Sequence, residues 1–519
     1  MKFNPFFLLI FVCVWAWMVG CLPSSQTDRP HGYLVIGIES NPTHLDPRYA
    51  TDANSSRIGA LIFNSLVRAD VNSHFQPELA ERWEAEDEQT YLFHIRKGIT
   101  FHNGKPLTAA DVKFTYDSVL EPKNHSPKRG VLRAIKAVDQ VGPYQVRFRL
   151  NAPHAPFLEN CTLGIVPEGS PITRDQKNHG LVGSGAFALQ ELLPGERVVL
   201  KANPFYWEGP PSVPGLVIKI IPDAIVRVLE FKKGTIDFLQ NDIEPDMLPW
   251  LKQNTNASIL TLQGTTFQYI GMNLDHPILK QQEVRQAIAL AIDRKMVIRH
   301  LLKGLATAAT GLLSPLHWAY EPSVPRLSYN PEEARKLLDR AGFRDPDGDG
   351  PLPRFKVSYK TTTLDLQKRI AEAFKEQLRR VGIELEIRTY EWGTFYGDIK
   401  KGNFHLYSLQ WVGISDPDIY FQLFHSSSIP PDGDNRGRYR NPEIDRLLEK
   451  GRKNLNLEER KLIYGSIQKI LAQELPYIPL WWKKNVVVMK PAVQGFIPYP
   501  DGELISMKKV LLLRSQPPT

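Results

Sequence analysis

The chain has 519 residues, of which 42% are hydrophobic and 23% are charged, an ordinary composition for a globular protein with more than one core. The formal net charge of +8 could indicate a nucleic-acid partner. However, Lys and Arg are interleaved with Asp and Glu, as in NPEIDRLLEKGRKNLNLEERK, residues 441–461, which is typical of a solvated helix surface. We therefore expect no binding to nucleic acid.

The N-terminal segment has the pattern of a secretory signal. Lys2 is followed by the apolar run PFFLLIFVCVWAWMVG, residues 5–20, and then by Cys21. The run is shorter than the roughly 20 apolar residues that cross a bilayer, which favours a cleaved signal over a membrane helix. We predict a signal peptide over residues 1–20 and a polar tether over residues 21–32.

The sequence MVGC, residues 18–21, resembles the lipobox of bacterial lipoproteins. The resemblance implies cleavage before Cys21 and its lipidation, which would make the protein a membrane-anchored lipoprotein of the periplasm or the cell surface. Of the three cysteines, Cys13 would leave with the signal and only Cys161 would remain as a thiol. The mature protein could then form no intramolecular disulfide.

The segment 98–119 carries His, Asp and Thr side chains and could suggest a catalytic loop. Its residues HNGKPL instead predict a turn built on Asn103 and Gly104. Thr108 is a candidate N-cap for the helix that follows, and Asp111 stands where it would complete a capping box.

Two patterns could suggest a metal, but neither is complete. His94 and His102 have no third ligand at a fixed spacing. DPDGDG, residues 345–350, resembles the start of a calcium loop, but the twelfth position, which needs a carboxylate, is Lys356. We expect no metal and no cofactor.

Periodicity and end signals predict alternating elements in the second half of the chain. They indicate helices over residues 283–304, 330–342 and 366–381, and strands over 354–359 and 383–387. The second of these helices has Asn330 as a candidate N-cap and Gly342 as its stop. Strand, helix and strand with short joints predict a parallel pair of strands in an α/β sheet.

No nucleophile elbow, phosphate-binding loop or metalloprotease motif is present in the sequence, which lowers the odds of an enzyme. Trp411 lies where a strand gives way to a loop that carries Gly and Asp. An aromatic side chain in that setting suits a cleft for a small amphipathic ligand.

Residues 77–119, PELAERWEAEDEQTYLFHIRKGITFHNGKPLTAADVKFTYDSV, are similar to the signature of the family 5 extracellular solute-binding proteins. These are the peptide, nickel and opine receptors of ABC importers. Further similar segments follow in family order, among them LDPRYATDANSSRIGALIFNSLV, GSGAFALQELLPGERVVLKANPFYWEGPP, YIGMNL, VRQAIALAIDR and PYIPLWW. The resemblance implies a monomeric binding protein, not an enzyme, that hands a solute to a permease with its ATPase.

The resemblance also implies an α/β, two-lobed periplasmic-binding-protein fold of type II. The expected parts are lobe I over residues 33–266 with an extra small domain at about 61–182, lobe II over 267–483, and a return to lobe I over 484–519. The crossings between lobes should lie near Leu262–Tyr269 and Trp481–Val486. Ligand would favour closure, because only the closed form contacts it from both sides.

The residues expected to bind the ligand are Trp411, Ile414, Asp416, Asn273, Lys360, Asn435, Arg436 and Arg438. Peptide receptors of the family usually place an amine-binding Asp where Ile414 stands, and dipeptide receptors an Arg in the loop that here offers Lys360. The sequence lacks both of these charged residues, which argues against a dipeptide zwitterion as the ligand, because burying an unpaired ligand charge is costly. A longer or blocked peptide, or another solute, stays open. Arg436 and Arg438 either pair with a ligand carboxylate or face solvent.

Two other functions remain in competition with solute capture. One is a secreted hydrolase. The other is a signalling or chaperone receptor on the same fold, since fold alone does not fix function.

Overall fold

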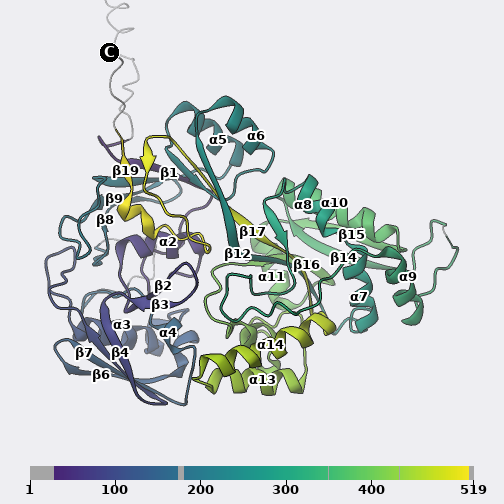
Figure 1. The fold of residues 1–519 in the computed structure, drawn as a ribbon, viewed down its shortest axis with the longest axis horizontal. Coiled ribbons are helices and arrows are strands. Elements are labelled where there is room, and N and C mark those ends of the chain that lie inside the picture. Colours follow the sequence, from purple (N-terminus) through teal and green to yellow (C-terminus); the bar gives the residue numbers. More distant parts are fainter. Residues whose placement is uncertain (1–28, 173–179, 349, 432, 514–519) are drawn as a thin grey trace, which may run out of the picture.

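The computed structural model describes residues 29–172, 180–348, 350–431 and 433–513, which form two lobes of mixed helices and strands (Figure 1). The predicted two-lobed α/β fold is confirmed. The predicted signal peptide, Cys21 and the tether up to residue 28 lie outside the described residues. Within the part of the chain that is described, no helix combines the length and the hydropathy that crossing a bilayer requires.

The first lobe is built on one half of a large sheet. Its strands are, in spatial order, β11 (Phe238–Gln240), β1 (Leu34–Ile38), β10 (Gly215–Ile220), β9 (Arg197–Ala202) and β8 (Phe187–Leu193). Every residue of β1 is buried because both faces of the sheet are covered. On one face lie α2 (Ala53–Ile62) and the C-terminal segment with β18 (Val493–Gln494), η4 (Ile505–Lys509) and β19 (Leu511–Leu512); on the other lie α5 (Ala224–Lys233) and α6 (Met247–Asn254).

A small domain with its own core extends the first lobe. Its four-stranded sheet has the order β4 (Ala80–Asp87), β5 (Thr90–Ile95), β7 (Gln145–Leu150) and β6 (Ile135–Gly142). The core also includes residues of α3 (Ala109–Leu120), β2 (Val67–Ala69) and α4 (Phe157–Asn160), and β3 (Phe75–Pro77) pairs with β2. The predicted capping box is confirmed, since the Thr108 amide donates to Asp111 Oδ2 at 2.7 Å. Segment 98–119 therefore serves the fold of this domain.

The second lobe carries the other half of the large sheet, with β15 (Ile383–Tyr390), β14 (Phe355–Thr362) and β16 (Leu406–Trp411). The predicted parallel pair is confirmed in β14 and β15. The helices are α7 (Gln282–Ala291), α8 (Arg294–His300), α9 (Pro331–Arg340), α10 (Asp365–Arg379), α11 (Trp392–Lys401), α12 (Ile419–Phe424), α13 (Pro442–Lys453) and α14 (Leu457–Glu474).

The prediction of one helix over residues 283–304 is wrong, because the structure has two helices there. The structure divides it into α7 and α8 at Ile292 and Asp293. The Asp293 side chain accepts a hydrogen bond from the Met296 amide at 2.9 Å, so it caps a new helix instead of continuing the old one.

Two long antiparallel strands, β12 (Ser258–Met272) and β17 (Tyr477–Met489), run through both lobes (Figure 1). On the first-lobe side β17 pairs with β11, and on the second-lobe side β12 pairs with β16 and β17 with β13 (Ala306–Ala308). The ladder between β12 and β17 is interrupted between Gln263 and Phe267. The lobes are therefore joined by a pair of strands with a break in their pairing at the crossing.

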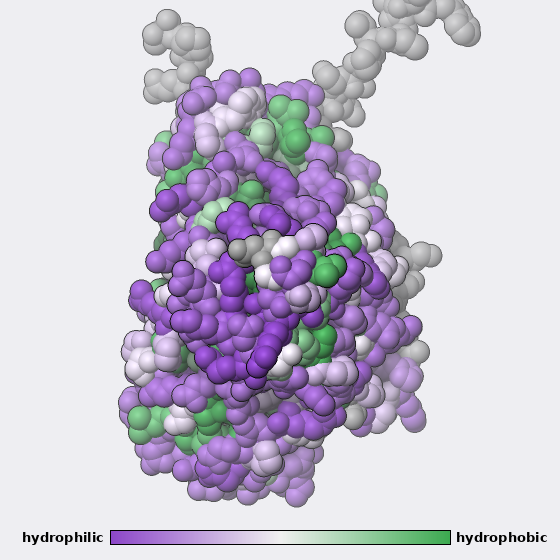
Figure 2. Space-filling model, turned by 90° about the vertical axis from the view of Figure 1, so that its right-hand side faces the viewer, coloured by the Kyte–Doolittle hydropathy of each residue, from purple (hydrophilic) through white to green (hydrophobic). Residues whose placement is uncertain are grey.

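The surface is mostly hydrophilic when it is viewed from the side of the second lobe (Figure 2). Many of its basic side chains have acidic partners one helical turn away, such as Arg446 with Glu443 at 2.7 Å and Arg379 with Glu376 at 2.9 Å. Such pairs support the interpretation of the charged segments as solvated helix surface.

Candidate ligand-binding cleft

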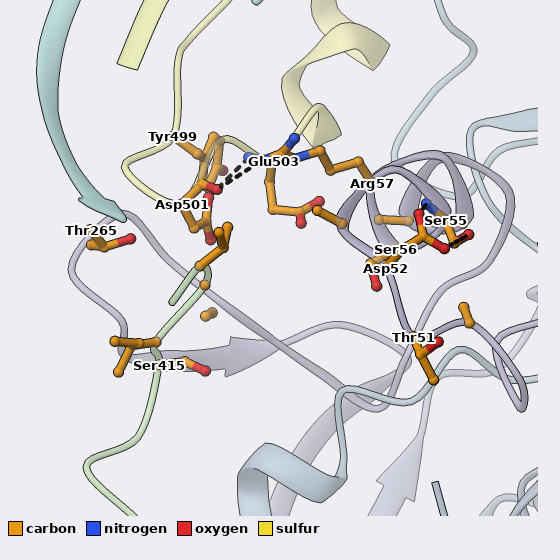
Figure 3. A pocket seen from close by; sticks show the side chains of 18 of the residues that line it. Thr51, Asp52, Ser55, Ser56, Arg57, Thr265, Ser415, Tyr499, Asp501 and Glu503 are labelled. Atoms are coloured by element: carbon orange, nitrogen blue, oxygen red, sulfur yellow. Dashed lines mark hydrogen bonds between the residues drawn. The ribbon is translucent and has the colours of Figure 1, made fainter. Parts of the chain in front are cut away.

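A cavity of about 960 Å³ lies between the two lobes. The first lobe contributes α2 with the loop before it, the β2–β3 hairpin, α4 and residues 499–505. The second lobe contributes the end of β14, the start of α10 and residues 408–410 and 412–415. Figure 3 shows Asp52, Arg57 and Glu503 of the first lobe and Ser415 of the second around the same space. Because both lobes line the cavity, its shape depends on the angle between them.

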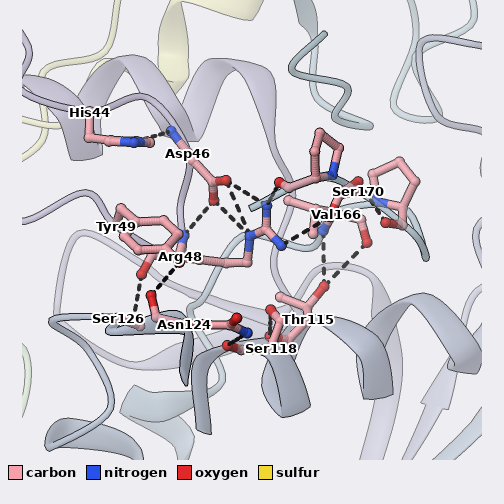
Figure 4. A network of polar contacts seen from close by, with 12 residues as sticks. His44, Asp46, Arg48, Tyr49, Thr115, Ser118, Asn124, Ser126, Val166 and Ser170 are labelled. Atoms are coloured by element: carbon pink, nitrogen blue, oxygen red, sulfur yellow. Dashed lines mark hydrogen bonds and ion pairs between the residues drawn. The ribbon is translucent and has the colours of Figure 1, made fainter. Parts of the chain in front are cut away.

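A buried network fixes the loop that precedes α2 (Figure 4). Arg48 is 1% exposed and its guanidinium pairs with Asp46 at 2.7 Å. The same guanidinium donates to the carbonyl oxygen of Pro171 at 2.7 Å, and Ser126 Oγ donates to the Arg48 carbonyl oxygen at 2.7 Å. This wall of the cavity is thereby attached to the small domain.

Of the eight residues expected at the site, Ile414 lines the cavity and the other seven do not. The Ile414 side chain is buried, with 6% of its surface exposed, and packs in a core of the second lobe. Trp411 packs against the same core, and the guanidinium carbon of Arg436 lies 4.9 Å from the centre of its ring.

Asp416 is held by a partner from α14. Its two carboxylate oxygens accept from the Arg460 guanidinium at 2.7 and 3.0 Å, and the residue is 8% exposed. Asp416 therefore serves the packing of the loop after β16, behind the cavity wall.

The remaining five residues share one feature, which is that the side chain of each has at least one polar partner within the second lobe. The pairs are Lys360 with Asp398 (2.5 Å), Arg436 with Asp434 (2.7 Å), Arg438 with Asp275 (3.5 Å), Asn273 with the carbonyl oxygen of Gly402 (3.2 Å) and Asn435 with that of Tyr439 (2.8 Å). The loop of Asn435 to Tyr439 thus supports the lobe from within.

Sequence reasoning missed three acidic residues of the cavity. Glu159 on α4 accepts from Ser415 Oγ of the opposite lobe, with both of its oxygens 2.6 Å from that hydroxyl, and burial raises the pKa of its carboxyl to about 7. Burial, together with the charge of Asp501, raises the pKa of Glu503 to about 8, and burial also raises that of Asp501. No motif marks these residues, because their elements meet only in the folded chain.

The charged lining is more acidic than basic. Its members are Asp52, Asp70, Glu78, Glu159, Asp242, Asp501 and Glu503 against Arg57, Arg68, Lys128 and Lys483. Among the described residues, no group of three or more His, Cys, Asp and Glu side chains is arranged to hold a metal ion.

Comparison with known proteins shows which family the chain resembles over most of its length. The profile described as "Bacterial extracellular solute-binding proteins, family 5 Middle" matches residues 74–431. The oligopeptide-binding protein AppA of Bacillus subtilis is 30% identical over 507 residues, which cover 94% of this chain and 92% of AppA.

Solved structures agree in fold over nearly the whole chain. AppA of B. subtilis in complex with a nonapeptide has a TM-score of 0.82 at 29% identity and covers 93% of this chain and 99% of its own. NikZ of Campylobacter jejuni in complex with Ni(L-His) has a TM-score of 0.83 at 26% identity and covers 93% and 100%. The chain belongs to the family 5 bacterial extracellular solute-binding proteins.

Proposed function

We propose that the protein captures a peptide or peptide-like solute between its two lobes and delivers it to the permease of an ABC importer. The single observation that carries this proposal is the cavity of about 960 Å³ lined by both lobes. Its volume is at the upper end of the roughly 300–1,000 Å³ that is usual for ligand pockets. It is large enough for more than a single small metabolite.

The connection between the lobes suits such a role. β12 and β17 cross with a break in their pairing between Gln263 and Phe267, so a change of lobe angle needs few bonds to be broken. A ligand that touches both lobes favours the closed angle, because only that angle makes both sets of contacts.

The relatives support a peptide-like ligand without fixing its kind. AppA is named for oligopeptides and was solved with a nonapeptide, whereas NikZ was solved with a nickel–histidine complex. The mixed apolar and charged lining of this cavity favours a ligand with both characters. We propose that Ile414 contacts an apolar part of it.

The experiment that tests the proposal is mass spectrometry of the solute that copurifies with the native protein. We expect a peptide or peptide-like compound that is released on denaturation and rebinds with no chemical change. A ligand that the purified protein cleaves would favour the secreted hydrolase instead. Failure to bind any peptide from a mixed library would contradict the proposal.

A further inference from the structure

We propose that Glu159 binds a free ammonium group of the ligand, so that the solute is a peptide or peptide-like amine. This inference rests on the proposed function and names the chemistry of one end of the cavity. It makes a residue of the small domain a determinant of ligand choice.

The position of Glu159 is the first argument. It lies on α4 of the small domain, lines the cavity, and reaches the second lobe at Ser415, whose Oγ is 2.6 Å from both of its carboxylate oxygens. A group bound to Glu159 would therefore touch both lobes at once. Such a group favours closure, since its contacts are complete only when the lobes are together.

The lack of a cation is the second argument. A carboxylate offers about four acceptor sites, and a single hydroxyl can donate to it only once. Ser415 is the partner that the described residues give the Glu159 side chain. Partial removal of a carboxylate with so few donors from water is costly unless a positive charge joins it, and this desolvation raises the pKa of the Glu159 carboxyl.

The charged side chains around Glu159 are already paired with one another. Asp416 and Asp418 are the acids whose charges act on Glu159. Arg460 binds Asp416 at 2.7 Å, and Arg452 binds Asp418 at 2.8 Å. These two guanidinium groups are therefore occupied, which leaves room for a cation of the ligand at Glu159.

Three other acids of the cavity accept hydrogen bonds from backbone amides. Asp52 accepts from the Ser55 amide as the N-cap of α2, Asp70 accepts from the amides of its own hairpin, and Glu78 from Ser65. Glu503 is the nearest competitor: its Oε2 is buried and has no hydrogen-bond partner among the described residues. However, the positive charge of Arg57 acts on Glu503, whereas the cations near Glu159 are engaged elsewhere.

An ammonium group fits the geometry chemically. It can donate to both Glu159 oxygens and to Ser415 Oγ, and charge-assisted bonds of this kind are roughly twice as strong as neutral ones. An N-acetylated terminus carries no charge and donates at most one such bond. The cavity should therefore discriminate between the two forms of one peptide.

The test uses the purified protein, washed free of copurified solute, and a synthetic library of random pentapeptides without lysine. Free-amine and N-acetylated members are offered in equal amounts, and captured members are counted by mass spectrometry. We expect the wild type to enrich free-amine members at least tenfold, and Glu159→Gln to bring the ratio close to one. Glu81→Gln is the matched control, because Glu81 is exposed on β4 and the same charge is removed; its ratio should equal that of the wild type.

The possible outcomes separate the role of Glu159 from the proposed function as a whole. Equal capture of both forms by the wild type, or an unchanged ratio in Glu159→Gln, overturns the inference but leaves the proposed function intact. Loss of the preference in Glu503→Gln but not in Glu159→Gln assigns the amine to Glu503 instead. Capture of no peptide by the wild type overturns the proposed function itself. If Glu159→Gln does not fold, Glu159→Asp withdraws the charge by one methylene, and a ratio equal to that of the wild type overturns the assignment.

Discussion

At the scale of single residues, the ion pair between Asp416 and Arg460 should contribute to the stability of the second lobe. Both are nearly buried, at 8% and 4% exposure, and their N–O distance is 2.7 Å. Because Asp416→Ala leaves a buried guanidinium without its partner, we expect the free energy of unfolding to fall by about 3–5 kcal/mol. Urea denaturation measures this loss.

The matched control is Glu443→Ala, which removes the partner of Arg446 at an exposed position. It should change the free energy of unfolding by less than about 1 kcal/mol. Equal effects of the two substitutions would contradict the structural role of Asp416.

Glu159 gives the ligand-free protein a pH dependence of defined sign. Burial raises the pKa of its carboxyl to about 7, whereas an exposed Glu titrates near roughly 4.3. Between these values the unfolded chain has lost the proton and the folded chain keeps it, so the free energy of unfolding falls as pH rises. We expect Glu159→Gln to remove about 1–3 kcal/mol of that fall, measured by urea denaturation from pH 4.5 to pH 7.5. Identical pH profiles for variant and wild type would contradict the burial of this group.

Individual residues show where sequence reasoning stops. Ile414 and Asp416 stand two positions apart in one loop, yet the first lines the cavity and the second turns to Arg460, 44 residues further along the chain. A loop acid near a cleft looks the same in the sequence whether a ligand or a distant Arg neutralises it. Glu159 gives no signal at all, because its importance comes from a contact with the other lobe.

At the scale of elements, Gly264 occupies the break in the ladder between β12 and β17. A Cβ added there would lie 2.4 Å from the carbonyl oxygen of Lys483, so the two strands would have to move apart. We expect Gly264→Ala to cost about 1–3 kcal/mol, as overpacking usually does. Thermal unfolding measures the cost, and small-angle scattering measures any change in the lobe angle.

Gly393→Ala is the control for this substitution. An added Cβ meets nothing within 4 Å at that position in α11, so stability should be unchanged or slightly higher. If Gly264→Ala behaved in the same way, the strands at the crossing would have room that the structure does not give them.

Local elements could be predicted because their signals are local. Asn330 caps α9 by accepting from the Glu333 amide at 3.0 Å, and α10 buries Ile370, Phe374 and Leu378 on one face, as periodicity indicates. The break at Asp293 was missed, since an Asp between two apolar stretches can as well lie on a helix surface. Pairing between strands far apart in the sequence, such as β12 with β17, could be expected only from the family resemblance.

At the scale of the whole molecule, the anchor is a testable expectation that lies outside the described residues. Cys21→Ser should prevent lipidation and shift the protein from the membrane fraction to the soluble fraction, because one substitution removes the only proposed attachment. Cell fractionation with immunoblotting checks the result. A variant that stays in the membrane fraction would contradict lipid anchoring.

The order in which the chain is made has a consequence for when it can bind. The core around Leu34 and Ile36 is completed by Val487, Phe496 and Met507, which are synthesised after the whole second lobe. Residues 499–505 also form one wall of the cavity. A chain that lacks this segment therefore has neither a finished first lobe nor a complete cavity wall. Binding in the cavity should therefore wait until this segment has been made, and a chain truncated before it should not bind the ligand of the full-length protein.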